Sequence, residues 1–368
     1  MAEQVKHYFA RGNTAEGLHS LMESVYQGLS TIYVVQGYPG GTATVLGRLA
    51  SAWTLRGWNI ELIHQPLESN LLEGIILEDA QLGLVDGDAW SEELNPEGTE
   101  IRYIDIRETL DTEKVAENSE TITTLESEIS NLYGKAYVTF LRTLRIHDEW
   151  EKFYIDNLDR EVMNQLAEEW GDDYLIPQLE EKVGKEIHRF LGAATSSGAV
   201  DFVPNLTDKL QTRIFVKGRP GSGKSTLFKK IANAALDRGI DTEIYHCGFD
   251  PHSLDMLIFP ELSLAIFDST APHEHYPVRE GDSILDVYEL AITEGTDEKY
   301  AKEVAEVKAR YTSSMKESTA FLTEAKRVKD ELRGIYLDAV DEEALLQRTE
   351  SLLNEIDTLV SEITSAAH

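Results

Sequence analysis

The sequence predicts an α/β protein built from two tandem units, each with a parallel sheet flanked by helices and followed by a long helical segment. Three observations predict this fold class. An apolar strand, a glycine-rich loop and an amphipathic helix follow one another in residues 213–236. Residues 32–55 repeat that arrangement earlier in the chain. Glu, Lys, Ala and Leu dominate the end of each unit, as is typical of long helices.

The glycine-rich loop at residues 218–225 matches the pattern G-x-x-x-x-G-K-[S/T] at every fixed position. An apolar run from Ile214 to Val216 precedes it, and helical spacing follows it to Leu236. The loop therefore stands between a strand and a helix, as the pattern requires. The residues that we expect to bind a ligand here are Gly218, Arg219, Pro220, Gly221, Ser222, Gly223, Lys224, Ser225 and Thr226.

The residue types in this loop suit a phosphate group. Glycines let the backbone approach a ligand closely, so that successive N–H groups can point at phosphate oxygens. The helix that begins at the loop adds the positive end of its dipole. We expect Lys224 to reach the terminal phosphates and the Ser225 hydroxyl to bind Mg²⁺. The predicted ligand is ATP, with GTP as an alternative, together with Mg²⁺.

The chain is a tandem duplication, with units of about residues 1–185 and 186–368. Sliding the sequence by 181 positions places residues 37–44 over residues 218–225. After one inserted residue the offset becomes 182, and residues 146–156 fall on residues 328–338. Identical pairs include His7 with His188, Gly37 with Gly218, Pro39 with Pro220, Gly40 with Gly221, His64 with His246 and Asp86 with Asp268.

Four segments follow from this duplication. We expect a glycine-loop domain at residues 1–110 and a helical segment or linker at 111–185. A second glycine-loop domain follows at 186–295, and a C-terminal helical segment at 296–368. In the last segment, apolar positions alternate spacings of four and three, which favours core packing over the binding of a partner. This stripe contains Leu345, Thr349, Leu352, Ile356, Leu359 and Ile363.

Further strands are expected in both domains. A second strand is predicted at residues 60–64 and again at 242–246. A third, apolar strand ends at Asp86 in the first unit and at Asp268 in the second. Strands that alternate with helices indicate a parallel sheet covered on both faces.

The two loops differ in chemistry. Ala43 stands where the second loop has Lys224, and Thr42 stands in place of Gly223, although Thr44 keeps a hydroxyl group. Without the ammonium group, the first loop loses its direct charge contact with terminal phosphates. We therefore predict that the first unit binds nucleotide weakly or not at all.

The candidate catalytic residues lie after the second and third strands of the second unit. Asp268 ends an apolar strand, as expected of the aspartate that holds Mg²⁺. The next residue is Ser269, where many nucleotide-hydrolysing proteins have a water-orienting glutamate, so we expect slow hydrolysis. The candidate bases are His273, Glu274, Asp250 and Asp255, with His273 first because histidine titrates near neutral pH. An ordinary loop role for His273 is the competing interpretation.

Other reactive side chains have simpler interpretations. A zinc site made from Cys247 and the histidines would need a compact spacing that the sequence does not show. Cys247 closes an apolar strand, which favours packing over reactivity. His147 and Glu151 are four residues apart and can share a helix face, and we interpret them as a solvated or interdomain contact. The histidines weighed for zinc are His246, His252, His273 and His275.

Composition excludes several classes of partner. The 66 acidic and 34 basic residues give a net charge of −32, which disfavours nucleic acid and anionic lipid surfaces. No apolar run is long enough to span a bilayer, and the N-terminal residues lack the apolar core of a signal peptide. A single cysteine fits a reducing compartment. The cytoplasm is therefore the expected location.

By the loop GRPGSGKS and the strand ending in Asp268, the chain resembles the P-loop nucleoside triphosphatase superfamily. The segments YHCGFDPHSLDM, FDSTAPHEHYP and IHDEWEKFYI are similar to a little-characterised bacterial family of duplicated P-loop ATPases. This resemblance covers nearly the whole chain and implies ATP binding and a Rossmann-like sheet. The family's first unit can also carry a lysine-bearing loop, from which this chain departs at Thr42, Ala43 and residues 88–90.

Three functions are consistent with these patterns. The first is a Mg²⁺-dependent ATPase whose second unit hydrolyses ATP slowly, with Lys224 as the phosphate clamp and Arg219 or Arg279 as an additional cation. The second is a small-molecule or nucleotide kinase in which Asp250 or Asp255 accepts a hydroxyl proton, although residues 271–299 contain only Arg279. The third is a nucleotide-gated interaction protein whose long helices report the bound state to a protein partner.

Overall fold

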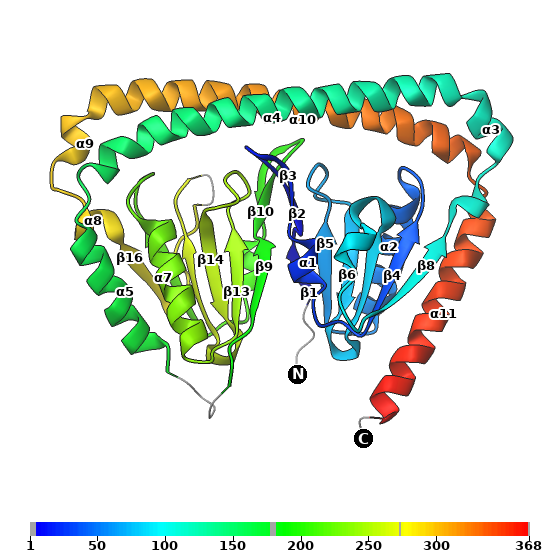
Figure 1. The fold of residues 1–368 in the computed structure, drawn as a ribbon, viewed down its shortest axis with the longest axis horizontal. Coiled ribbons are helices and arrows are strands. Elements are labelled where there is room, and N and C mark those ends of the chain that lie inside the picture. Colours follow the sequence, from blue (N-terminus) through cyan, green and yellow to red (C-terminus); the bar gives the residue numbers. More distant parts are fainter. Residues whose placement is uncertain (1–4, 177–181, 272–273, 367–368) are drawn as a thin grey trace.

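The computed structural model describes residues 5–176, 182–271 and 274–366, which form two α/β units beneath a pair of long helices (Figure 1). Each unit contains a six-stranded sheet, and the two sheets have the same strand order. The α/β class and the duplication that the sequence predicts are therefore confirmed in the architecture. Two short antiparallel hairpins, one from each unit, lie beside the sheets.

The sheet of the first unit runs in the order β1-β5-β6-β7-β4-β8. Strand β6 is antiparallel to both of its neighbours, whereas the other pairs are parallel. The strands and helices of this unit are β1 (Val5–Tyr8), β2 (Arg11–Thr14), β3 (Gly17–Ser20), α1 (Met22–Val25), β4 (Thr31–Gln36), α2 (Gly41–Leu55), β5 (Ile60–His64), β6 (Leu72–Leu77), β7 (Leu82–Asp86) and β8 (Glu100–Asp105).

The second unit repeats this order as β9-β13-β14-β15-β12-β16, with β14 antiparallel to its neighbours. Its elements are β9 (Glu186–Phe190), β10 (Gly192–Thr195), β11 (Gly198–Asp201), α6 (Val203–Thr207), β12 (Thr212–Lys217), α7 (Lys224–Asp237), β13 (Thr242–His246), β14 (Leu254–Phe259), β15 (Leu264–Asp268), β16 (Asp282–Asp286) and α8 (Val287–Ala291).

The expectation of a parallel sheet is confirmed only in part, because β6 and β14 are antiparallel to their neighbours. Strands β5 and β6 are joined by residues 65–71, and β13 and β14 by residues 247–253. Each connection is too short for the crossover that parallel neighbours need, so the next strand pairs in the antiparallel direction. Strands β6 and β14 are buried along their whole length, which explains their mostly apolar sequences, although β6 contains Glu73 and β14 contains Asp255.

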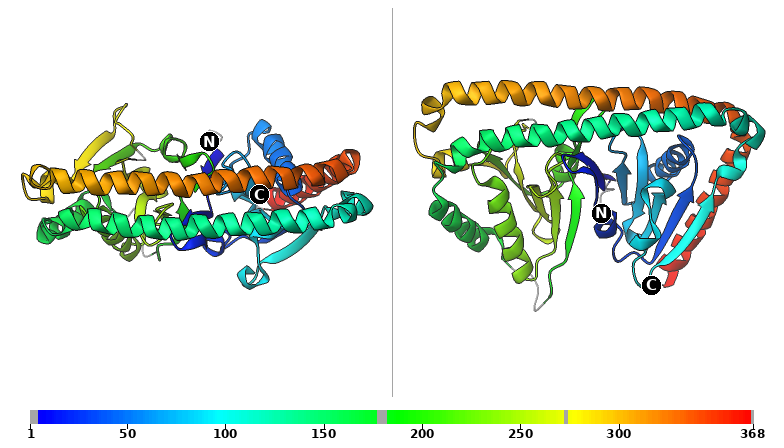
Figure 2. Two further views of the ribbon diagram at one scale, coloured as in Figure 1. Left: turned by 90° about the horizontal axis from the view of Figure 1, so that it is seen from above. Right: turned by 45° about the horizontal axis from the view of Figure 1, so that its top comes forward.

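The helical segments cross from one unit to the other. After the first unit come α3 (Thr112–Glu117), α4 (Ser119–Ile155) and α5 (Arg160–Tyr174). After the second unit come α9 (Thr296–Lys299), α10 (Ala301–Ala339) and α11 (Glu342–Ala366). Figures 1 and 2 show α4 and α10 side by side above both sheets, while α5 lies on the second unit and α11 on the first. We call residues 111–174 the first arm and residues 296–366 the second arm.

Each arm completes the core of the opposite unit. Met163, Ala167 and Trp170 of α5 are buried among apolar residues of α7 and the second sheet. Leu345, Leu352 and Ile356 of α11 are buried in the same way against α2 and the first sheet. Core packing of the apolar stripe in α11, as the sequence predicts, is therefore confirmed.

Equivalent backbone hydrogen bonds hold each arm where it turns from its long helix onto the opposite unit. The Asp159 N–H donates to the Ala291 carbonyl at 2.8 Å, and at the equivalent positions the Asp341 N–H donates to the Thr109 carbonyl at 2.8 Å. Single antiparallel bridges accompany them, between Leu110 and Val340 and between Leu158 and Ile292. The two arms and their contacts are therefore related by a pseudo-twofold axis.

The two units also contact each other directly. Phe9 and Phe190 exchange backbone hydrogen bonds of 3.0 and 2.9 Å across the pseudo-twofold axis. Nearby, the buried Arg189 guanidinium lies 2.8 Å from the Glu61 carboxylate and 3.2 Å from Glu243. Removing one member of such a network would leave a buried charge without its partner, so the network favours a single alignment of the units.

Among residues 5–176, 182–271 and 274–366, no helix combines the length and the apolar character that crossing a membrane requires.

Candidate functional site

The backbone of residues 218–225, which we call the second glycine loop, turns tightly before helix α7. Gly221 and Gly223 have φ angles of 77° and 87°, in the left-handed region that favours glycine. Helix α7 begins at Lys224 directly after Gly223, and no described side chain caps its first turn. Unused N–H groups at a helix N-terminus attract anions.

Lys224 lies inside this loop. Its side chain is only 9% exposed, and its Nζ donates to the Arg219 carbonyl at 3.0 Å. The same Nζ is 3.5 Å from the Asp268 Oδ2. Strands β12 and β15 are parallel neighbours, with Val216 opposite Asp268, and this register places the aspartate beside the loop. The structure thus brings together Lys224 and Asp268, which the sequence proposes for one site.

Neighbouring groups hold these side chains in place. The Asp268 Oδ1 accepts hydrogen bonds from the Thr270 backbone N–H at 2.9 Å and from its hydroxyl at 2.6 Å. The Ser225 hydroxyl oxygen accepts the Leu254 N–H at 3.0 Å. The Ser222 hydroxyl oxygen accepts the Arg219 N–H at 3.2 Å inside the loop. The Asp268 carboxylate and the Ser225 hydroxyl are oxygen ligands of the kind that a hard cation prefers.

The arginines proposed as additional cations point elsewhere. Arg219 pairs with Asp297 at 2.9 Å and lies over the Tyr288 ring, on the outer side of the loop. Arg279 donates to the carbonyls of Thr207 and Leu210, at 3.0 and 2.5 Å. Both guanidinium groups thus have structural partners, and Arg279 is occupied in bracing the connection after α6.

The end of α4 lies against the second glycine loop. A methyl group on Gly221 would come within 2.9 Å of the Glu151 Cα, so the loop packs directly on the first arm. His147, one turn earlier, has its Nδ1 3.8 Å from the Glu151 Oε1. The His147 ring packs near the rings of Phe249 and Tyr311. The predicted interdomain contact is confirmed, but its location at the loop is one that sequence reasoning missed.

Charged groups at the loop influence the pKa values of His147 and Glu151. Burial and the Asp148 carboxylate raise the pKa of Glu151, while the Lys224 ammonium lowers it. Burial lowers the pKa of His147, and Lys224 acts in the same direction. Asp250, a candidate base, is close enough to influence both groups. A signal for this arrangement exists in the sequence, since His147 and Glu151 are one turn apart in a segment aligned between the units.

Of the remaining candidate bases, Glu274 is exposed. His273 lies outside the described residues. Asp255 is buried, and together with burial it raises the pKa of the nearby Cys247 thiol. A raised thiol pKa disfavours the reactive thiolate. Packing therefore accounts for Cys247 better than reactivity does. Thr226, at the loop's end, is exposed.

The described histidines weighed for zinc lie apart and have other partners. His246 pairs with His188 at 2.7 Å, and His252 lies 2.9 Å from Glu16. His275 lies 3.1 Å from Asp201. Within the described ranges, no three His, Cys, Asp or Glu side chains are grouped as metal ligands. Mg²⁺ differs from zinc because it commonly takes only one or two protein carboxylates and completes its shell with phosphate and water.

Residues 37–44, the first glycine loop, contain different chemistry. Ala43 is buried where the second loop has Lys224. The Tyr38 ring folds over Gly41, and the Tyr336 ring of the second arm stacks on it at 5.9 Å. Arg333 of the same arm lies on Gly40, where a methyl group would be 2.8 Å from its Cγ. The first loop is thus covered by aromatic and cationic side chains.

Acidic residues around the first loop have cationic partners. The buried Glu68 lies 2.6 Å from Arg333 and 3.5 Å from Lys326, both on α10. Glu73 pairs with Arg11 at 2.6 Å. Burial and the nearby Asp88 raise the pKa of Asp86, the equivalent of Asp268, to about 6. The second arm therefore brings positive charge to the loop that lacks its own lysine.

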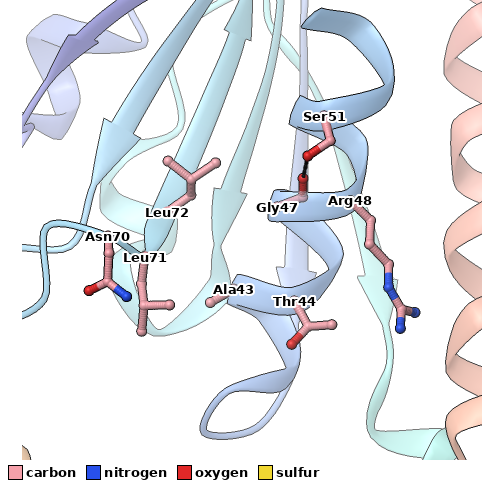
Figure 3. A pocket seen from close by; sticks show the side chains of 8 residues that line it. All are labelled: Ala43, Thr44, Gly47, Arg48, Ser51, Asn70, Leu71 and Leu72. Atoms are coloured by element: carbon pink, nitrogen blue, oxygen red, sulfur yellow. Dashed lines mark hydrogen bonds between the residues drawn. The ribbon is translucent and has the colours of Figure 1, made fainter. Parts of the chain in front are cut away.

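A cavity of about 470 Å³ opens beside the first loop (Figure 3). Gly47 leaves it open, because a Cβ at this position would contact nothing within 4 Å. The lining residues come from α2, from the connection to β6 and from the start of β6: Ala43, Thr44, Gly47, Arg48, Ser51, Asn70, Leu71 and Leu72.

Comparisons of the chain with protein-family models, curated proteins and solved structures found no match.

Proposed function

We propose that the chain binds Mg²⁺–ATP at the second glycine loop and hydrolyses it slowly, while the first unit is a nucleotide-free copy that anchors the arms. The observation that carries this proposal is the position of Lys224, held inside a glycine-built loop 3.5 Å from Asp268. A buried lysine at a helix N-terminus beside a strand-end carboxylate suits a phosphate group with its divalent cation.

Each residue then has a defined role. The backbone N–H groups at Gly221 and Gly223 face phosphate oxygens, and Lys224 exchanges its bond to the Arg219 carbonyl for one to the terminal phosphates. Ser225 and Asp268 hold the magnesium ion, which supplies charge neutralisation at the phosphates. Ser269 follows Asp268 and has no carboxylate, so the position after the metal aspartate does not orient water and turnover is slow.

The local charges favour a nucleotide bound with a divalent cation over the nucleotide alone. Lys224 is the cation inside the loop, whereas the acidic groups around it include Asp250, Asp268 and Glu151. A triphosphate alone would add further negative charge to this acidic region. The accompanying Mg²⁺ offsets that repulsion, so we expect binding to depend strongly on Mg²⁺.

Isothermal titration with ATP and GTP, each with and without Mg²⁺, tests the proposal. We expect about one site per chain, and Lys224→Ala should weaken binding by roughly a hundredfold, since it removes a charge-assisted contact with phosphate. The matched control is Lys229→Ala, which removes an exposed lysine from the same helix. Unchanged binding and turnover in Lys224→Ala would exclude this site, and two tight sites per chain would contradict the role of the first unit.

A second candidate function is a nucleotide-gated interaction protein. The contact between Gly221 and the end of the 37-residue helix α4 favours it, because a ligand at the loop would act directly on an element that spans both units. Negligible turnover combined with a large ATP-dependent change in hydrogen exchange of α4 and α10 would favour this candidate over an ATPase. The kinase alternative has less support, since Arg279 is engaged with backbone carbonyls.

A further inference from the structure

Glu151 places a carboxylate at the second glycine loop. Its backbone packs on Gly221, where a methyl group would lie 2.9 Å from both the Glu151 Cα and its carbonyl carbon. The Gly221 N–H and the Lys224 ammonium both favour the charged form of this carboxylate, against burial and Asp148, which disfavour it. These are the two kinds of group that a phosphate would use in the same loop.

The pseudo-twofold relation identifies the equivalent residue in the other arm as Arg333. It lies on Gly40 of the first glycine loop, and its guanidinium pairs with the buried Glu68 at 2.6 Å. The arm residue is thus anionic at the loop that has a lysine and cationic at the loop that lacks one. Glu151 therefore brings to the second loop the negative charge that a bound phosphate would bring. Arg333 brings to the first loop the positive charge that the missing lysine would bring.

We propose that Glu151 is a tethered anion that occupies the second glycine loop in the nucleotide-free chain and leaves it when the phosphates bind. This inference rests on the proposed function, because it assigns a competitor to the same loop. The end of α4 is then the element that moves. Its other contacts there include the Tyr154 hydroxyl, which donates to Asp297 at 2.8 Å, and the packing of His147 near Phe249.

The variant Glu151→Gln tests this competition. It keeps the size of the side chain and removes its charge, so the affinities for ATP with Mg²⁺ and for inorganic pyrophosphate should both rise, by about three- to tenfold. The matched control is Glu149→Gln on the same helix. Glu149 pairs with Arg310 on α10, so the control should leave both affinities unchanged. Titration calorimetry gives each dissociation constant.

A second measurement uses the unmodified chain. Hydrogen exchange of residues 146–156 should increase when ATP and Mg²⁺ saturate the protein, because the end of α4 loses its contact with the loop. Protection of this segment by the nucleotide would overturn the proposal. This readout does not depend on whether any variant folds well.

The outcomes separate this inference from the proposed function. If Glu151→Gln tightens pyrophosphate binding but no form of the chain binds ATP, the tethered anion stands and the nucleotide function fails. If the unmodified chain binds one ATP with the same affinity as Glu151→Gln, the function stands and the tethered anion is excluded. Unchanged affinity with lost turnover would instead place Glu151 in catalysis, and that result also overturns the proposal.

Discussion

The two glycine loops of this chain occupy equivalent places in equivalent sheets, yet they are covered in opposite ways. At the second loop, Lys224 lies inside and Glu151 of the first arm lies against Gly221. At the first loop, Ala43 replaces the lysine, the Tyr38 ring folds inward, and Arg333 of the second arm covers Gly40. The duplicated backbone is therefore retained while the charge that the arm brings is reversed.

This difference shows how a loop of the ligand-binding type can take on a structural role. Arg333 has a permanent partner in the buried Glu68, so its contact with the first loop stabilises the fold. The charge of Glu151 is favoured instead by Lys224 and the Gly221 N–H, groups that a bound phosphate would also use. The first loop fixes its arm by an ion pair, whereas the second holds its arm by a contact that an anion can replace.

Breaking the Arg333 contact should have the largest effect on stability. Arg333→Ala removes the closest cation of Glu68 and leaves Lys326 at 3.5 Å, and a buried carboxylate that loses an ion pair is costly. We expect a loss of about 2–3 kcal/mol in the free energy of unfolding, measured by urea denaturation. Glu151→Ala should cost much less, as should Arg327→Ala, which removes an exposed arginine of α10. Equal losses in Arg333→Ala and Glu151→Ala would contradict the distinction between the loops.

Asp86 gives an intermediate, pH-dependent effect. Its pKa in the folded chain is about 6, above its usual value of 3.8, because burial and Asp88 disfavour the charge. Between these two values the folded chain binds more protons than the unfolded chain, so this group's contribution to stability falls as pH rises through that window. Asp86→Asn should therefore stabilise the chain by about 2 kcal/mol at pH 8 and by much less at pH 4.

Denaturation with urea at both pH values measures this difference. A stabilisation by Asp86→Asn that is the same at pH 4 and pH 8 would mean that the charge of Asp86 is not its origin. In the second unit, Asp268 has Lys224 at 3.5 Å, a partner that Asp86 lacks at the equivalent position.

The smallest expected effect concerns Gly47. It lies inside α2, and a Cβ there would meet nothing within 4 Å, so alanine fits without strain. Gly47→Ala should raise the free energy of unfolding by about 0.5–1 kcal/mol, because alanine favours a helix interior. Gly40→Ala provides the contrast, since its φ of 87° makes alanine unfavourable there. A loss of stability in Gly47→Ala would show that the cavity in Figure 3 is not free to accept a methyl group.

Local sequence patterns predicted part of this architecture well. The strand, loop and helix around Lys224 follow from apolar runs and glycine positions, and the 181-residue offset predicts that the first unit repeats them. The antiparallel strands β6 and β14 were missed. Their mostly apolar sequences suit any buried strand, and only the short connections before them set their direction.

The crossing of the arms could not be derived from helical periodicity. The apolar stripe from Leu345 to Ile356 predicts a buried face, but either unit offers a sheet for it to cover. For the same reason, His147 and Glu151 could be placed on a shared helix face but not at the loop of the other unit. Lys224 and Asp268 were predictable together, because adjacent parallel strands end at the same edge of a sheet.

The exchange of arms also has a consequence for the order of folding during synthesis. Tyr33, in the first sheet, hydrogen-bonds Glu355 of α11, which the ribosome adds 322 residues later. The core of the first unit includes Leu345, Leu352 and Ile356, so the first unit to be translated is the last to be completed. Until then its α2 face exposes apolar surface, and the newly made half is the part of the chain that most needs protection from aggregation.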